Sequence, residues 1–206
     1  VQGASGMNMY SPASLSKLLE IAKQYGVLTI ADEVFTGFGR TGSWFASDYL
    51  NEKPDIICLS KTVTGGFLPL GLTAVNELVF NAFYSDEQKH TFLHGHSYTG
   101  NPLCCASANA ALELMHKDDF WPKLKGIENR ISYHISRLKT HEFVRDARCV
   151  GAIGAIEVDR GGKSSYFNDS GKEIYKKLLK KGVILRPLGN VFPVVAVSYT
   201  HLRAHE

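Results

Sequence analysis

The sequence predicts an α/β layered domain followed by a smaller α+β domain. Up to about residue 116, helical patterns alternate with short apolar runs, which is typical of strands and helices packed in layers. Beyond that point, one longer amphipathic helix pattern is followed by short strand patterns and glycines. The 206 residues suffice for one large domain, or for one and a half.

The first part begins with a helix and a strand. Ser11 and Pro12 are typical of a helix N-cap and first position, and Gly26 is a suitable residue for its end. The almost wholly apolar run 27–31 then predicts a buried parallel strand. Further apolar runs predict strands at 55–59 and 70–75, and helical patterns cover 76–84 and 102–116.

The second part has a different composition. An amphipathic pattern predicts a helix over 120–139, and strand patterns cover 144–150 and 152–158 on either side of Gly151. A surface loop over 159–171, a helix over 172–181 and a strand over 183–185 follow. We expect a small antiparallel sheet, and domains at 1–116 and 117–192. The last residues, 193–206, continue no core pattern, and we expect them to be a non-native tail.

Composition excludes several classes of protein. With 23 basic and 20 acidic residues the net charge is +3, and no basic block interleaved with aromatics predicts a nucleic-acid partner. No apolar run is long enough to span a bilayer. The four cysteines suit neither zinc nor a disulfide framework, so we expect free thiols and a cytoplasmic protein. Because the chain starts at Val1, we interpret it as a fragment.

Asp32 and Lys61 are the candidate chemical residues. Each follows an apolar run, and ligands of parallel sheets bind beyond the carboxyl ends of the strands. Such a lysine can form a Schiff base, and such a carboxylate can keep a pyridine nitrogen protonated, which together suit pyridoxal 5′-phosphate (PLP). The alternatives are a turn-capping Asp32, a solvated Lys61, or a Walker B acid, although the chain contains no Walker A motif.

Two segments carry a resemblance to a known family. The run Asp32-Glu33-Val34-Phe35-Thr36-Gly37-Phe38-Gly39-Arg40-Thr41-Gly42 is similar to the signature of class III PLP-dependent aminotransferases. The segment 54–61, with Gly65 and Gly66 after it, resembles the family's lysine segment. The resemblance implies part of the large domain of fold type I PLP-dependent transferases, with Lys61 as the catalytic, cofactor-binding lysine and Asp32 at the cofactor's ring nitrogen.

A third segment, 94–103, resembles the family's loop that closes over the cofactor phosphate of the other subunit. The resemblance implies that His96 and Ser97 contact the phosphate, that Gly95 lies against the substrate, and that the parent protein is a homodimer. His94 and His96 could instead be a metal-binding pair, but the sequence indicates no third ligand, so we expect no metal.

The segment 182–191 resembles the class III aminotransferases of biotin synthesis. The resemblance implies that Arg186 binds a substrate carboxylate, for which a guanidinium is well suited; a surface charge is the alternative. It also implies amino transfer from S-adenosylmethionine to 8-amino-7-oxononanoate, giving 7,8-diaminononanoate. The rival interpretations are an ω-aminotransferase acting on ornithine, 4-aminobutyrate, β-alanine or a diamine, and an inert fragment. Because the family's N-terminal half is missing, we expect this chain alone to be inactive.

Overall fold

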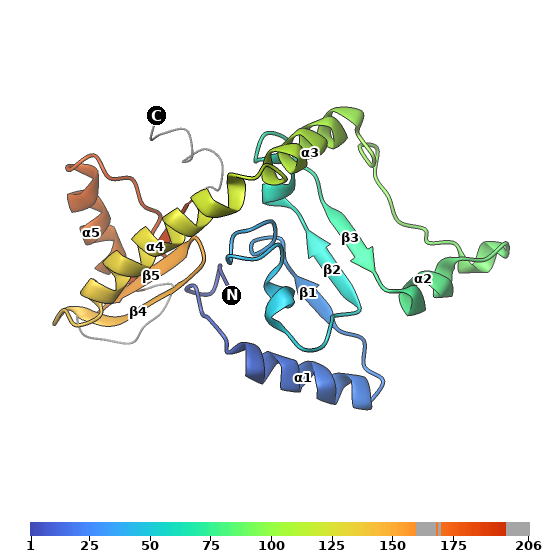
Figure 1. Cartoon of the computed structure of the whole chain (residues 1–206), viewed down its shortest axis with the longest axis horizontal. Coiled ribbons are helices and arrows are strands. Elements are labelled where there is room, and N and C mark those ends of the chain that lie inside the picture. The colour runs from blue at the N-terminus through green and yellow to red at the C-terminus, as the bar shows by residue number, and fades with distance from the viewer. Residues whose placement is uncertain (160–167, 169, 197–206) are drawn as a thin grey trace. The chain divides into compact units, whose positions relative to one another are not determined.

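A computed structural model describes residues 1–159, 168 and 170–196 of the chain, and these residues divide into two compact units (Figure 1). The first unit contains Val1–Tyr10, Gly39–Ser43 and the chain from Trp121 onward. The second contains Ser11–Phe38 and Trp44–Phe120. The chain therefore passes from the second unit to the first at Gly39, inside the 32–42 motif, and returns to the second unit at Trp44. The expected domains 1–116 and 117–192 stay predictions about the whole protein.

The second unit holds a three-stranded sheet in the order β1-β2-β3. Its strands are β1 (Ile30–Asp32), β2 (Ile56–Leu59) and β3 (Leu72–Val75); β1 and β2 are parallel, and β3 is antiparallel to β2. The helices are α1 (Pro12–Gln24), α2 (Glu77–Phe83) and α3 (Pro102–Met115), with short 3₁₀ helices η1 (Ala46–Tyr49), η2 (Lys61–Thr64) and η3 (Gln88–His90). In Figure 1, α1 runs along the β1 side of this sheet.

The helix ends follow from local chemistry. Ser11 is the N-cap residue of α1 and Pro12 its first residue, as predicted, although the Ser11 side chain makes no capping hydrogen bond. Asn101 caps α3, since its side-chain oxygen accepts the backbone N–H of Leu103 at 2.9 Å. The expected strand at 27–31 is wrong in extent and burial. Strand β1 begins only at Ile30, which is 66% exposed, and in the described part of the chain β1 is an edge strand that pairs with β2.

The core of the second unit lies between η2 and α3. Thr62, Val63 and Thr64 of η2 are buried. The helix α3 buries one face, which consists of Cys104, Ala108, Ala111 and Met115. The hydroxyl of Ser107 donates to the backbone carbonyl of Thr64 at 3.0 Å, so α3 and η2 are joined by a hydrogen bond as well as by apolar packing.

The first unit is an antiparallel sheet in the order β4-β5-β6 with two helices. The strands are β4 (Val144–Val150), β5 (Ile153–Val158) and β6 (Val191–Val195), and the helices are α4 (Phe120–Leu138) and α5 (Ser170–Leu179). The helix α4 crosses the sheet (Figure 1). Gly154 permits this close approach, because a Cβ there would lie 2.9 Å from Cγ2 of Ile131. The antiparallel sheet and the long helix are therefore confirmed.

The N-terminal segment is fixed to this sheet by Arg148. Its guanidinium donates to the carbonyl of Met7 at 2.9 Å and to that of Gly6. It also pairs with Asp146 and, at 3.3 Å, with Glu157. The half-buried Arg148 thus satisfies two loop carbonyls and two carboxylates.

Two expectations for the end of the chain are wrong. Val183–Leu185 forms no strand, because the N–H of Val183 donates to Leu178 at 3.0 Å and terminates α5 around Gly182 at φ +76°. The expected lack of a structural pattern from residue 193 is wrong at its start, because Pro193–Val195 forms the second half of β6, paired with β5, with half-buried side chains. The non-native origin of the tail stays a prediction. The rest of the expected tail, from residue 197, lies outside the described residues, as do 160–167 and 169 of the expected loop.

Candidate functional site

Asp32 and Lys61 follow neighbouring parallel strands and lie at the same edge of the sheet. Asp32 is the last residue of β1 and pairs with Cys58 of β2. β2 ends at Leu59, and Lys61 begins η2 directly beyond it. Both side chains are exposed. The backbone therefore brings a carboxylate and an amine to one edge, as the two apolar runs predicted.

The backbone around Lys61 is in an uncommon conformation. Lys61 has φ +48°, which is rare for a residue with a Cβ and is typical of functional sites. The three residues after it are buried, and Gly65 ends η2 at φ +70°. Before it, the hydroxyl of Ser60 donates to the carbonyl of Leu70 at 2.7 Å. The lysine is thus an exposed side chain on a firmly held turn.

Phe35 is a neighbour of Lys61 that the sequence did not indicate. The Nζ atom of Lys61 lies 5.6 Å from the centroid of the Phe35 ring, which is within the range of a cation–π contact. Phe35 belongs to the turn that follows β1, three residues after Asp32. The contact connects the turns that carry the two candidate residues. Only the position of Phe35 inside the 32–42 motif could have suggested it.

Glu33 is a second residue whose contacts the sequence did not reveal. Its side chain is only 3% exposed. One carboxylate oxygen accepts the Thr36 hydroxyl at 2.6 Å and the N–H of Ala46 at 2.8 Å, and the other accepts the N–H of Ser47 at 2.7 Å. A buried carboxylate with three donors is a structural anchor of this turn.

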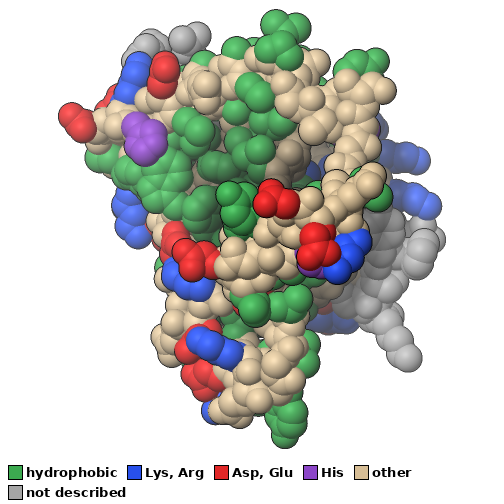
Figure 2. All heavy atoms as spheres, turned by 90° about the vertical axis from the view of Figure 1, so that its right-hand side faces the viewer, with side chains coloured by type: hydrophobic (Ala, Val, Ile, Leu, Met, Phe, Trp, Pro, Cys, Tyr) green, Lys and Arg blue, Asp and Glu red, His purple; other side chains and the backbone are tan. Residues whose placement is uncertain are grey.

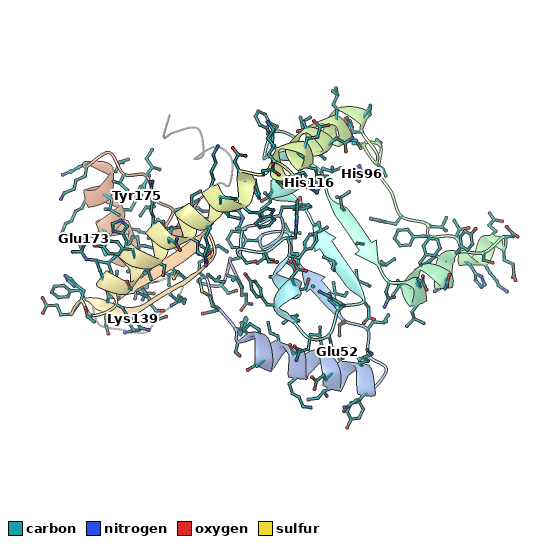
Figure 3. The ribbon with its side chains drawn as sticks, viewed as in Figure 1. Glu52, His96, His116, Lys139, Glu173 and Tyr175 are labelled. Atoms are coloured by element: carbon teal, nitrogen blue, oxygen red, sulfur yellow. The ribbon has the colours of Figure 1, made fainter. Side chains whose placement is uncertain are left out.

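The loop with Gly95, His96 and Ser97 is exposed and folded on itself. The N–H of His96 donates to the Thr99 hydroxyl at 2.9 Å, and its Nδ1 accepts the N–H of Tyr98 at 3.1 Å. His96 lies on the segment that leads into α3, and His116 lies at the far end of that helix (Figure 3). Within the described chain, no hydrogen bond or ring contact joins this loop to Asp32 or Lys61. The role of this loop at the cofactor phosphate therefore stays a prediction.

Arg186 lies in the other compact unit and is exposed. It follows the turn at Gly182 in a stretch without regular structure. Because Arg186 and Lys61 belong to different compact units, the role of Arg186 as a carboxylate ligand stays a prediction. In the same described part of the chain, no group of three His, Cys, Asp or Glu side chains is arranged to hold a metal ion.

A cavity of about 350 Å³ lies at the opposite edge of the sheet, where Thr29 and Asp55 precede β1 and β2. Its charges are already paired. Glu52 lies beside the end of α1 (Figure 3) and accepts a hydrogen bond from Lys23 at 2.8 Å, which raises the pKa of that lysine. Asp55 accepts the N–H and hydroxyl of Thr29, and these bonds hold its pKa below 3.8. This cavity therefore lies where β1 and β2 begin, at the end of the strands away from Lys61.

The residues at the carboxyl edge suit PLP. An exposed amine can condense with the cofactor's aldehyde, and a carboxylate on the neighbouring strand can pair with the pyridine nitrogen. The donor set offers both functions at one edge of one sheet, from strands whose register is fixed by backbone hydrogen bonds. The chemistry of these two side chains thus fits the two reactive ends of the cofactor.

The model of the family described as aminotransferase class III matches residues 1–204. This chain belongs to the class III aminotransferases. The family depends on PLP, in agreement with the fold type and the cofactor expected from the 32–42 and 54–61 segments. In the described residues, no helix of this class III aminotransferase chain is both long and apolar enough to cross a membrane.

The chain is similar to curated class III aminotransferases of one kind. It is 45% identical over 193 residues to the adenosylmethionine-8-amino-7-oxononanoate aminotransferase of Synechococcus elongatus, covering 93% of this chain and 44% of that protein. The enzyme of the same name from Helicobacter pylori is 40% identical, with 92% and 44% covered. The chain thus spans less than half the length of these relatives.

Solved structures agree with this assignment. The crystal structure of adenosylmethionine-8-amino-7-oxononanoate aminotransferase from Methanocaldococcus jannaschii matches with a TM-score of 0.88 and 35% identity, covering 96% of this chain and 48% of that one. The ω-transaminase of Pseudomonas jessenii, solved in complex with PMP, matches with a TM-score of 0.84 and 26% identity, covering 93% and 44%. The class III aminotransferase fold is therefore present in the described part of this chain.

Proposed function

We propose that the protein to which this chain belongs transfers an amino group from S-adenosylmethionine to 8-amino-7-oxononanoate, giving 7,8-diaminononanoate in biotin synthesis. The observation that carries the proposal is the pair Asp32 and Lys61 at one sheet edge, in a chain 45% identical to an enzyme of that name. Since the chain spans 44% of that relative, the activity is proposed for the complete protein.

Lys61 and Asp32 have separate roles in this proposal. PLP, when bound, supplies an electron sink for the pair of electrons released at the substrate carbon. The amine of Lys61 holds the cofactor and, once released, moves a proton at that carbon as a general base. The carboxylate of Asp32 keeps a proton on the ring nitrogen. Asp32 is exposed at the end of β1, beside β2, and this position supports that role.

The remaining predicted residues bind rather than react. The Ser97 hydroxyl and the backbone of His96 hold the cofactor phosphate, and Gly95 leaves room for the substrate. Arg186 binds the carboxylate of 8-amino-7-oxononanoate through two parallel hydrogen bonds. The exposure of all four residues in this chain supports a role in contacts with other molecules or subunits.

We also propose that the complete protein is a homodimer. The segment around α2 supports this, because it exposes large apolar side chains: Leu78, Phe80, Phe83, Tyr84, Phe92 and Leu93. Figure 2 looks at the side that carries α2 and shows hydrophobic side chains open at the surface. A surface of this kind is typical of a protein interface. We propose a cytoplasmic location, which the four free cysteines support.

The cofactor assignment is tested by borohydride reduction of the complete protein with PLP, followed by peptide mass spectrometry. We expect the pyridoxyl mass on the peptide that contains Lys61, and its loss in Lys61→Ala. Lys89→Ala, which changes an exposed lysine in η3, is the control and keeps the label. A pyridoxyl group on any other lysine of the wild type would refute the role of Lys61.

The substrate assignment is tested by offering amino donors separately. We expect S-adenosylmethionine to support formation of 7,8-diaminononanoate. Transfer from glutamate or alanine, with no use of S-adenosylmethionine, would instead identify an ω-aminotransferase of ornithine, 4-aminobutyrate, β-alanine or a diamine. Failure of every donor, together with no uptake of PLP, would identify an inert protein.

A further inference from the structure

Glu33 has an unusual environment for a carboxylate. Its side chain is 3% exposed, and its interactions in the described chain are hydrogen bonds from Thr36, Ala46 and Ser47 with no ion pair. Burial of a carboxylate without a cation is costly, and the three donors offset this cost. A carboxylate whose burial is unfavourable, and which three donors nevertheless satisfy, is expected to fix the local conformation of the chain.

Glu33 fixes the conformation of the turn that begins at Asp32, the last residue of β1. The backbone N–H of Glu33 donates to the carbonyl of Cys58 at 2.9 Å, so the residue is tied to β2 as well. Its carbonyl accepts the N–H of Gly37 at 2.9 Å, where a Cβ would lie 3.0 Å from that same oxygen. The turn is therefore fixed from both the main chain and the side chain.

The side chain of Glu33 binds the start of η1. The N–H groups of Ala46 and Ser47 are the first two of this short helix, and both point to the Glu33 carboxylate. A negative group at this end satisfies donors that have no partner within the helix. Glu33 thus connects the residues after β1 to a segment more than ten positions later in the chain.

The same turn carries Phe35. The centroid of its ring lies 5.6 Å from the Nζ atom of Lys61. Asp32 and Phe35 flank Glu33 on the same turn, and Thr36, the next residue, donates to Glu33. Any rotation of the turn would move the carboxylate of Asp32 and the Phe35 ring together. The distance between the Lys61 amine and this turn therefore depends on the Glu33 anchor.

We propose that Glu33 is a positioning residue, which fixes the turn after β1 and thereby sets the positions of Asp32 and of Phe35 against Lys61. The inference rests on the proposed role of Lys61. Glu33 itself touches neither cofactor nor substrate in this role, and acts through the turn. Thr36 supports it by occupying one carboxylate oxygen.

The test compares Glu33→Gln with wild type in the complete protein. The amide presents a donor where the carboxylate accepted one, so we expect hydrogen exchange at Ala46 and Ser47 to accelerate at least tenfold. In cofactor-free protein, we expect acylation of Lys61, measured by mass spectrometry, to accelerate about two- to fivefold, the factor that a cation–π contact at an exposed site corresponds to. With PLP added, the absorbance maximum of the lysine-bound cofactor should shift.

Asp55→Asn is the matched control. Asp55 also accepts three hydrogen bonds, from Thr29 and Asn76, but at the opposite edge of the same sheet. We expect this variant to lose stability while Lys61 acylation and the absorbance maximum stay at wild-type values. Faster exchange in Glu33→Gln with unchanged Lys61 acylation would overturn the proposal, as would equal effects of the two variants.

Two milder variants serve if Glu33→Gln does not fold. Thr36→Val removes one donor to Glu33, and Phe35→Leu removes only the ring from Lys61. Both should accelerate Lys61 acylation, and the absence of an effect in Thr36→Val would overturn the proposal. If wild type takes up no PLP at Lys61, the proposed function fails, whereas the exchange and acylation measurements still decide the role of Glu33.

Discussion

The ammonium nitrogen of Lys61 lies 5.6 Å from the centre of the Phe35 ring. The lysine comes from the turn after β2 and the ring from the turn after β1, so the contact crosses between two neighbouring strand ends. It gives the exposed lysine a preferred direction before any cofactor arrives. Preorganisation of this kind reduces the ordering that ligand binding would otherwise require.

Asp32→Asn should separate cofactor attachment from catalysis. The amide cannot keep a proton on the ring nitrogen, so we expect kcat of the complete protein to fall on the order of a hundredfold, the usual effect of losing one preorganised electrostatic contact. Borohydride reduction should still label Lys61. Asp118→Asn, which alters an exposed aspartate after α3, is the control and should leave kcat unchanged. A kcat within twofold of wild type in Asp32→Asn would contradict the role of Asp32.

Asp55 should make stability depend on pH in acid. Its pKa is lowered from 3.8 by hydrogen bonds from Thr29, so its contribution to folding is complete above that value and is lost as the pH falls through the lower folded-state pKa. We expect Asp55→Asn to cost about 1–2 kcal/mol at pH 7, and the difference from wild type to shrink below pH 3.8. Denaturant unfolding at several pH values measures this, and a difference that grows in acid would show the opposite sign.

Gly151→Ala should destabilise the first unit. Gly151 has φ +53°, and a Cβ there would lie 2.3 Å from the carbonyl carbon of Thr41 and 2.5 Å from the nitrogen of Gly42. Backbone atoms cannot give way cheaply, so we expect a loss of about 1–3 kcal/mol in unfolding free energy. Gly126→Ala, in the helix α4 with nothing within 4 Å, is the control and should gain about 0.5–1 kcal/mol. Equal stabilities of the two variants would refute the steric argument.

Arg148→Lys should loosen the N-terminal segment. A lysine cannot reach the carbonyls of Gly6 and Met7 while also pairing with Asp146 and Glu157, as the guanidinium does. We expect amide exchange in residues 1–10 to accelerate by about tenfold or more, which corresponds to the loss of one or more charge-assisted hydrogen bonds. Arg137→Lys, on the exposed face of α4, is the control and should leave amide exchange in residues 1–10 unchanged.

The sequence indicated the residues that depend on local patterns. Asp32 and Lys61 were found because each follows an apolar run, and parallel strands bring such ends to one edge. Glu33 and Phe35 were not assigned contacts, because their partners are Ala46, Ser47 and Lys61, which lie far along the chain. Pairing across such distances leaves no periodic signal in one sequence.

The errors at the end of the chain also have physical causes. Val183 to Leu185 are apolar enough for a strand, but the N–H of Val183 closes α5 instead. Pro193 lacks the N–H that a strand ladder needs. It nevertheless lies within β6, which pairs with β5 as the last strand in the sheet order, so β6 has an unpaired side where a proline is tolerated.

The division of the 32–42 motif between two compact units limits how this protein can be cut. Residues 1–10 and 39–43 belong with the chain beyond Trp121, whereas the residues between them belong with the sheet that carries Lys61. No single cleavage point therefore separates one unit from the other. A truncated gene that ends near residue 120 would encode the lysine and its sheet, together with two orphaned segments of the other unit. Separate expression of the two units of this chain would need a rearranged chain order rather than a shortened one.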